Sequence, residues 1–273
     1  MRLQEYGVGI FVSAFTKSAL KKALKKNLIT VNGDLATSAT MISGGEHIEL
    51  TIEEKVSPKK QLILPLKVIF EDDHLAVIHK PSGVLVSGNG FITVANGLAQ
   101  NLKTSPLADA TLPQPVHRLD FATTGVLLVG KTASAIRQLN KLFEDKKIKK
   151  TYFAVTIGEM DSEGRICSAI EGKKCESEYL VQQSVPSKRF GTLNLVKLHP
   201  HTGRRHQLRI HLSSIGKPIL GDKDYGIEGL ILKGKGMYLH AHSLEFVHPF
   251  TAEKVRIEDP LPEKFRKLFV GLD

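Results

Sequence analysis

The chain reads PVHRLDFATTGVLLVG from Pro115 to Gly130, and this stretch places a polar loop directly before an apolar run. The run from Gly125 to Gly130 is short, apolar and bounded by glycines, which predicts a buried β-strand. The loop before it carries Arg118 and Asp120, and loops held by a rigid sheet are common places for catalytic groups. From composition alone, an ordinary surface ion pair between these two residues would be the better reading.

Strand and helix patterns lie on both sides of this strand. Residues 67–70 and 75–78 predict two strands around a short acidic turn, and residues 150–157 predict another. Residues 133–146 have apolar side chains at helical spacing, with Thr132 as a plausible N-cap. Because strands and helices alternate irregularly and hairpins occur, we predict an α+β fold whose main domain has a central, largely antiparallel mixed sheet flanked by helices.

The first 54 residues form a separate pattern. Residues 18–28 predict an amphipathic helix, residues 29–35 a hairpin with Asn32-Gly33 as its turn, and residues 48–52 a further strand. One face of the helix carries four lysines, Lys21, Lys22, Lys25 and Lys26. Lysines that simply face water would explain that face equally well.

The order of these elements is more informative than the lysines. The run ALKKNLITVNG, residues 23–33, followed by GGEHI, residues 44–48, resembles the small alpha-L RNA-binding domain first described in a ribosomal protein. The resemblance implies a small N-terminal α/β RNA-binding domain over residues 1–54. A polar stretch predicts a linker over residues 55–64, and the main domain is expected over residues 65–273.

Composition limits the partners and the compartment. The 38 Lys and Arg exceed the 28 Asp and Glu, which gives a formal net charge of +10 and favours a polyanionic partner. Charge alone does not choose between RNA, DNA and an anionic membrane. No apolar run approaches the roughly 20 residues that span a bilayer. The two cysteines lack metal-site spacing, so we expect a cytoplasmic protein with no membrane association.

Two further stretches carry groups suited to nucleic acid. Residues 149–155, KKTYFAV, place Tyr152 on the more open face of a predicted strand, beside lysines, where an aromatic ring suits base stacking. A half-buried sheet tyrosine is the alternative. Residues 197–217 contain five Lys and Arg and no acid, which fits phosphate contact. Arginines in that stretch, among them Arg209, could also balance a buried carboxylate.

The three stretches, in this order, resemble the motifs of the RluA-type pseudouridine synthases. HRLD followed by TG resembles the catalytic-aspartate motif, KTY at residues 150–152 the second motif, and TGRRHQLR at residues 202–209 the third. The sequence departs from the usual pattern at Phe121-Ala122, where Arg-Asp is frequent, and at Arg205, where Thr or Ser is frequent. The resemblance covers about residues 65 to 250 and implies isomerisation of uridine to pseudouridine in a structured RNA.

The resemblance also implies a role for each site residue. Asp120 would act on the ribose, as a nucleophile at carbon 1 or as a base at carbon 2, and Arg209 would pair with it. Tyr152 would stack on the detached uracil and could assist loss of the carbon 5 proton. Arg118 would contact phosphate or fill the gap left by the flipped nucleotide, and Ile210 would form an apolar wall. We expect a monomer with no cofactor and no metal.

The expected substrate is large-subunit ribosomal RNA, because the enzymes of this family that act on the large subunit often carry an alpha-L-like module. Transfer RNA is an alternative substrate. A non-catalytic RNA-binding or ribosome assembly factor, and a nucleoside or glycoside hydrolase that uses Asp120, are alternatives of other classes. Free uracil released from RNA would identify the hydrolase.

Overall fold

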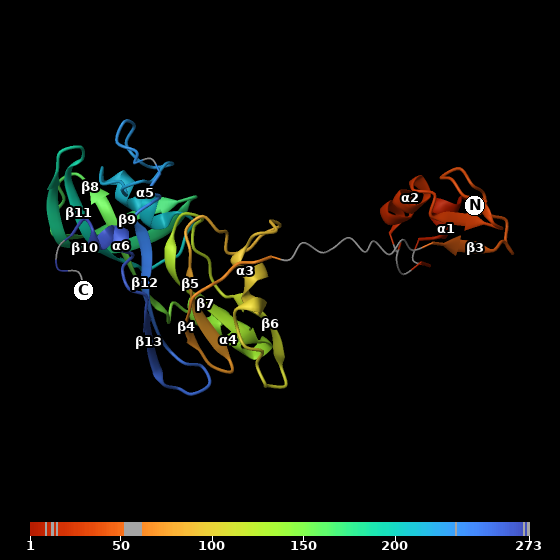
Figure 1. Cartoon of the computed structure of the whole chain (residues 1–273), viewed down its shortest axis with the longest axis horizontal. Coiled ribbons are helices and arrows are strands. Elements are labelled where there is room, and N and C mark those ends of the chain that lie inside the picture. Colours follow the sequence, from red (N-terminus) through yellow and green to blue (C-terminus); the bar gives the residue numbers. More distant parts are fainter. Residues whose placement is uncertain are drawn as a thin grey trace. The chain divides into compact units, whose positions relative to one another are not determined.

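The computed structural model describes residues 1–51 apart from 9, 12, 13 and 15, residues 62–269 apart from 233, and residue 271. The chain divides into two compact units, Met1–Gln61 and Leu62–Asp273, and each is described by itself (Figure 1). Most of the predicted linker, residues 55–64, lies outside the described residues.

The first unit is a helix packed with a small sheet. Its elements are α1 (Leu3–Tyr6), α2 (Lys17–Lys25), β1 (Ile29–Val31), β2 (Asp34–Leu35) and β3 (Ile48–Leu50), with strand order β2-β1-β3. The predicted turn is confirmed, since Asn32 and Gly33 have φ of 53° and 90° and join β1 to β2. The predicted helix ends earlier than residue 28, because Asn27 has φ of 57°, outside the helical region.

The second unit is built on one ten-stranded sheet in the order β4-β5-β7-β12-β8-β11-β10-β9, with β6 paired to β7 and β13 to β12. The prediction of a largely antiparallel mixed sheet is confirmed, because only the pair β7–β12 is parallel among the pairings described for this sheet. The strands are β4 (Val68–Glu71), β5 (Leu75–Lys80), β6 (Ala110–Pro115), β7 (Thr124–Thr132), β8 (Lys149–Ile157), β9 (Glu163–Ile170), β10 (Lys173–Ser187), β11 (Gly191–Pro200), β12 (Leu239–Val247) and β13 (Lys254–Glu258).

Helices lie beside different parts of this sheet. They are α3 (Val94–Gly97), which continues into the 3-10 turn η2 (Leu98–Gln100), α4 (Ala133–Glu144), α5 (Gln207–Ser214) and α6 (Glu263–Arg266). The predicted N-cap of α4 is confirmed, because the Thr132 hydroxyl accepts a hydrogen bond from the Ala135 amide at 3.1 Å. Helix α4 packs on β7, whereas α5 lies beside β9, β10 and β11 (Figure 1).

Strand β7 places the Asp120 loop at the centre of the sheet. All nine of its residues are buried, as expected for a strand with neighbours on both edges and on both faces. Its first residues, Thr124 and Gly125, pair in parallel with His240 and Ala241 of β12. The loop that precedes β7 therefore emerges where β5, β7 and β12 meet.

Candidate active site

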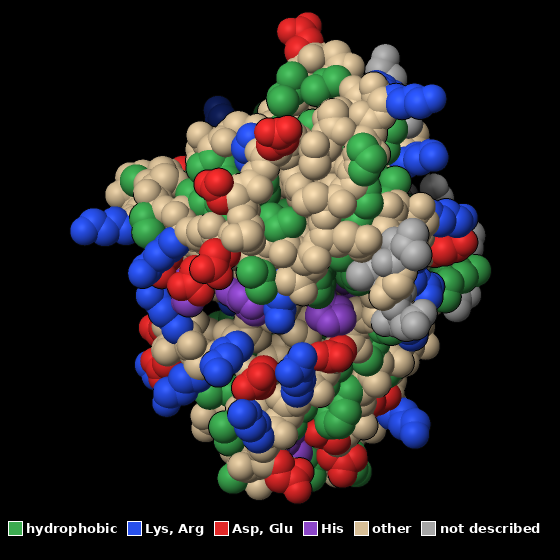
Figure 2. Space-filling view, turned by 90° about the vertical axis from the view of Figure 1, so that its left-hand side faces the viewer, with side chains coloured by type: hydrophobic (Ala, Val, Ile, Leu, Met, Phe, Trp, Pro, Cys, Tyr) green, Lys and Arg blue, Asp and Glu red, His purple; other side chains and the backbone are tan. Residues whose placement is uncertain are grey.

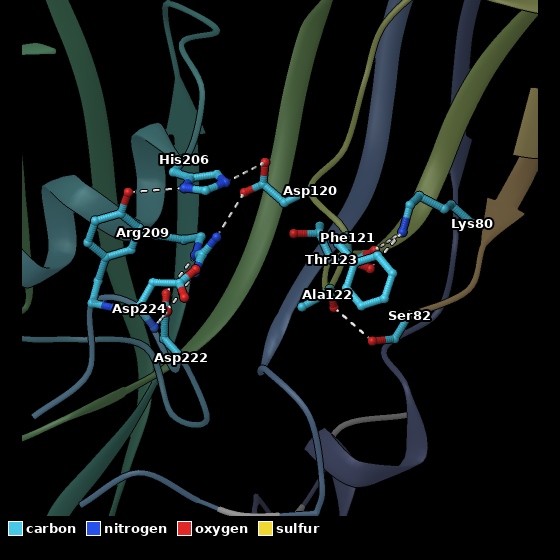
Figure 3. A network of polar contacts seen from close by, with 11 residues as sticks. Lys80, Ser82, Asp120, Phe121, Ala122, Thr123, His206, Arg209, Asp222 and Asp224 are labelled. Carbon is cyan, nitrogen blue, oxygen red and sulfur yellow. Dashed lines mark hydrogen bonds and ion pairs between the residues drawn. The ribbon is translucent and has the colours of Figure 1, made fainter. Parts of the chain in front are cut away.

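A buried lysine binds the carbonyl groups of the Asp120 loop. The ammonium of Lys80, at the end of β5, is 0% exposed and donates to the carbonyls of Pro81, Phe121 and Thr123 at 2.9, 3.2 and 2.8 Å. The Ser82 hydroxyl donates to the Ala122 carbonyl at 3.0 Å on the same side (Figure 3). These bonds satisfy the carbonyls of residues 121–123 and fix the loop on one side.

The first turn of α5 faces the loop from the other side. His206 precedes the helix with φ of 56° and ψ of 19°, a left-handed conformation that is uncommon for a residue with a side chain. The Gln207 carboxamide oxygen accepts from the Thr202 hydroxyl at 2.7 Å and from the Arg204 amide at 3.0 Å. Gln207 thereby orders the segment that leads into the helix and directs His206 toward Asp120.

Each carboxylate oxygen of Asp120 faces one basic side chain. His206 Nε2 lies 3.7 Å from Oδ1, and an Arg209 terminal nitrogen lies 3.7 Å from Oδ2 (Figure 3). The side chain of Asp120 is 18% exposed, so it is reachable from the cleft but largely removed from water. Charges in such a setting are screened less than at an open surface.

The main partner of Arg209 is Asp222 rather than Asp120. No role was predicted for Asp222 from the sequence. The guanidinium donates to both carboxylate oxygens of Asp222 at 2.7 Å, in a bidentate pair. It also donates to Asp224 at 2.6 Å and lies 4.9 Å from the centre of the Tyr225 ring. Three carboxylates therefore surround Arg209. The expected contact with Asp120 is one of the three, and it is the longest.

Tyr152 and Arg118 line one cleft with Asp120 and Arg209, whereas Ile210 does not line it. The cleft has a volume of about 310 Å³ and also contains Lys150, Arg204 and Arg205 among its basic residues. Ile210 is half-buried and lines a neighbouring hollow with Tyr225. Four of the five predicted site residues are therefore brought together.

Burial alters the pKa values of three groups at the site. Burial raises the pKa of the Tyr152 phenol, and the Asp120 carboxylate raises it further. Burial lowers the pKa of Lys80 to about 8, although Asp120 opposes this change. Burial also lowers the pKa of the His206 imidazole, although Asp120 opposes this change. The Tyr152 side chain is accordingly a neutral phenol rather than a phenolate.

The charged side chains are not sorted into one uniform positive surface. On the face seen in Figure 2, Lys and Arg are mixed with Asp and Glu. The described residues that line the cleft include Arg118, Lys150 and three arginines of residues 204–209 but only two acids, Asp120 and Glu171, and one of these arginines, Arg209, is also paired with Asp222 and Asp224. Such a lining suits a phosphate-bearing ligand.

The remaining histidines have other partners. His240 and His242 both contact the Asp259 carbonyl, at 3.1 and 2.9 Å, and the second ring nitrogen of His240 lies 2.9 Å from the Thr124 hydroxyl. Glu176, Glu178 and His201 lie close enough together for a metal ion, but Glu176 already pairs with Arg165 at 2.5 Å.

No helix among the described residues is long and apolar enough to cross a lipid bilayer.

Three residues at the site were not singled out from the sequence. His206 lies inside the quoted motif and was given no role, although a histidine three residues before Arg209 in an acid-free stretch was a recognisable candidate. Asp222 follows that stretch by only a few residues and was the nearest acid able to neutralise it. Lys80 follows the predicted strand at residues 75–78 by two positions, but its burial could not be read from its surroundings in the sequence.

Comparisons with known proteins relate this chain to RNA pseudouridine synthases. The family model for RNA pseudouridylate synthase matches residues 74–214. Ribosomal large subunit pseudouridine synthase C of Escherichia coli is 32% identical over 92% of this chain and 86% of its own length. Ribosomal large subunit pseudouridine synthase D of Vibrio cholerae is 32% identical over 94% of this chain and 87% of its own length.

A solved structure, human RNA pseudouridylate synthase domain containing 1, has a TM-score of 0.60 and 26% identity and covers 71% of this chain and 83% of that chain. The family match covers more than half of the chain and includes Asp120, Tyr152 and Arg209. The resemblance stated from the motifs is confirmed, and the chain belongs to the RNA pseudouridylate synthase family.

Proposed function

We propose that this protein isomerises uridine to pseudouridine in large-subunit ribosomal RNA, with Asp120 as the catalytic residue. The observation that carries the proposal is the position of Asp120, which lies between His206 and Arg209 in a basic cleft that Tyr152 also lines. The relatives named for the large ribosomal subunit support this RNA as the substrate.

The cleft suits a nucleotide that has left its helix. A stacked uridine cannot turn in place, so the target base must be flipped out, at a cost of a few kcal/mol. Arg118 is exposed at the cleft and is placed to contact phosphate or to occupy the gap. Tyr152 offers the ring of a neutral phenol, on which the detached uracil stacks while it turns.

Arg209 holds a positive charge beside Asp120. The guanidinium is 6% exposed, and its position is fixed by the bidentate pair with Asp222. It lies 3.7 Å from Oδ2 of the carboxylate that attacks carbon 1 or removes the carbon 2 proton of ribose. Isomerisation exchanges one carbon–nitrogen bond for one carbon–carbon bond, with no redox change.

The Asp120→Asn variant tests this proposal. We expect it to bind RNA with near wild-type affinity but to form no pseudouridine, because the amide lacks the negative charge. Pseudouridine is mapped in ribosomal RNA from cells that carry the wild type, the variant or neither protein, and free uracil is measured in vitro. Pseudouridine formed by the Asn variant would refute the role of Asp120, and free uracil released by the wild type would indicate a hydrolase instead.

A further inference from the structure

His206 is an ionisable group 3.7 Å from Asp120, and the roles given above do not use it. Its side chain is 18% exposed, and both ring nitrogens have defined neighbours. Nδ1 lies 3.0 Å from the Tyr225 hydroxyl and Nε2 lies 3.7 Å from Asp120 Oδ1, so the three groups form a chain (Figure 3). The left-handed backbone that aims the ring costs free energy, and such strain is concentrated at functional sites.

The proposed reaction requires a proton transfer that Asp120 alone does not explain. When uracil has rejoined ribose through carbon 5, that carbon still carries its hydrogen. The carbon 5–hydrogen bond must break, its electron pair forms the carbon 5–carbon 6 double bond, and nitrogen 1 takes up one proton. The uracil therefore loses one proton and gains one, and no oxidant or reductant is needed.

Two of the groups that line the cleft, Arg209 and Tyr152, are poorly suited to accept this proton. The Arg209 guanidinium is permanently charged and is engaged by Asp222 and Asp224. Tyr152 holds its own proton, because burial and the Asp120 charge both raise the pKa of the phenol. A neutral imidazole beside Asp120 has a free lone pair when Nδ1 carries the hydrogen and donates it to Tyr225.

We propose that His206, rather than Tyr152, accepts the carbon 5 proton through Nε2. This inference rests on the proposed function and adds a residue to the last step of the reaction, after uracil has rejoined ribose. The resulting imidazolium is stabilised by the Asp120 carboxylate on one side and by the Tyr225 oxygen on the other. It then donates a proton to nitrogen 1, directly or through water, which returns the ring to its neutral form.

The charges around His206 favour a neutral resting state that can still be protonated. Desolvation lowers its pKa, Asp120 and Asp224 raise it, and Arg209 and Arg205 lower it. Glu171 lines the same cleft. Because the anionic neighbours oppose the effects of burial and of the cationic neighbours, the ring can bind a proton during turnover and release it afterwards.

Carbon 5 deuteration tests the proposal directly. Single-turnover rates are measured for RNA that carries uridine or carbon 5-deuterated uridine at the target position. The His206→Asn variant keeps a residue that tolerates the left-handed backbone but cannot carry the proton. We expect its rate to fall by about 100-fold or more and its deuterium isotope effect to exceed that of the wild type, because proton loss becomes rate-limiting.

Two matched variants separate proton transfer from a structural role. In His206→Gly, which suits the same backbone conformation, added imidazole should restore much of the rate, whereas Asp120→Asn should not respond to imidazole. Tyr152→Phe should be slower with the isotope effect of the wild type.

An unchanged rate in His206→Asn, or a reduced rate with an unchanged isotope effect, would overturn the proposal. So would a larger isotope effect in Tyr152→Phe alone. If the wild type forms no pseudouridine in ribosomal RNA, the proposed function itself fails, and that result is visible before any His206 variant is measured.

Discussion

Arg209 is a buried cation whose position depends mainly on Asp222. The Asp222 side chain is 0% exposed and meets the guanidinium through two hydrogen bonds of 2.7 Å. It also accepts from the backbone amides of Asp224 and Tyr225 at 3.0 and 3.1 Å, which closes the turn that follows α5. One carboxylate thus orders both the arginine and the segment beyond it.

We expect Asp222→Ala to reduce the free energy of unfolding by about 3–5 kcal/mol, because it leaves a buried guanidinium without its main partner. Activity should fall as well, since Arg209 is then free to move away from Asp120. Urea unfolding and single-turnover kinetics are the measurements. Asp224→Ala is the control on the same guanidinium, and because Asp224 is 62% exposed it should cost about 1 kcal/mol or less. Equal losses in the two variants would contradict this hierarchy.

His240 links protonation to stability. Its side chain is fully buried, and desolvation lowers its pKa to about 4 from an ordinary value of 6.5, although Asp259 opposes the change. Between these two values the unfolded chain binds a proton that the folded protein does not. The stabilisation is therefore present above pH 6.5 and is lost as the pH falls toward 4.

The depressed pKa corresponds to a loss of about 3 kcal/mol in the free energy of unfolding between pH 7 and pH 4. His240→Gln removes the titrating group while its amide can still donate to the Asp259 carbonyl. We expect this variant to be less stable at pH 7 but to lose less stability on acidification than the wild type. Urea unfolding at both pH values gives the comparison, and parallel pH profiles would refute the assignment.

At the level of elements, the parallel contact of β7 with β12 is the point at which the catalytic loop is fixed. Gly125 has φ of 117°, and a Cβ atom there would lie 2.0 Å from the Ala241 carbonyl oxygen. Both the conformation and the close approach exclude any other residue. The glycine after HRLDFATT is thus required by strand pairing.

Gly125→Ala should prevent folding or reduce the free energy of unfolding by more than about 4 kcal/mol, because the strands must separate to admit the methyl group. Gly191 is a matched control, since its φ is also positive, at 72°, but it has open space around it. Gly191→Ala should cost only about 1 kcal/mol, from backbone strain. Soluble yield, circular dichroism and urea unfolding distinguish the two, and similar stabilities would show that β7 and β12 can shift apart.

Elements defined by local signals could be predicted from the sequence. The cap at Thr132, the Asn32-Gly33 turn and the apolar run of β7 each depend on residues a few positions apart. The strand order could not be predicted, because β12 joins β7 to β8 through residues more than 80 positions distant along the chain.

The candidate site shows the same difference between signals in nearby residues, which could be predicted, and contacts between distant residues, which could not. Asp120, Tyr152 and Arg209 lie in recognisable short motifs, and the structure brings them to one cleft. Asp222 lies in an irregular turn whose approach to Arg209 is set by how α5 and the following segment pack. Its part in the site follows from tertiary contacts that leave no periodic pattern in the sequence.

At the scale of the whole molecule, the positive charge is shared between the two units. A net charge of +10 attracts polyanions at long range. Four exposed lysines of the first unit, Lys21, Lys22, Lys25 and Lys26, lie on or just after α2. We propose that the first unit binds RNA through this lysine face, as the alpha-L resemblance implies.

Replacement of these four lysines by glutamine tests the role of the first unit. Glutamine has nearly the helix propensity of lysine, so α2 should persist. We expect KM for ribosomal RNA to rise and kcat to remain near the wild-type value, because the cleft is untouched. Each lost phosphate contact should also make the plot of log affinity against log salt shallower by about 0.7–0.9.

The matched control replaces four exposed lysines of the second unit that do not line the Asp120 cleft, Lys188, Lys235, Lys254 and Lys267, and lowers the net charge equally. If general attraction to RNA dominates, the two quadruple variants should lose affinity equally and show the same salt dependence. If the α2 face contacts phosphates, the plot of log affinity against log salt should become shallower only in the first variant, by the amount that corresponds to several phosphate contacts. Equal behaviour would therefore remove the first unit from the RNA interface and leave recognition to the cleft and its surroundings.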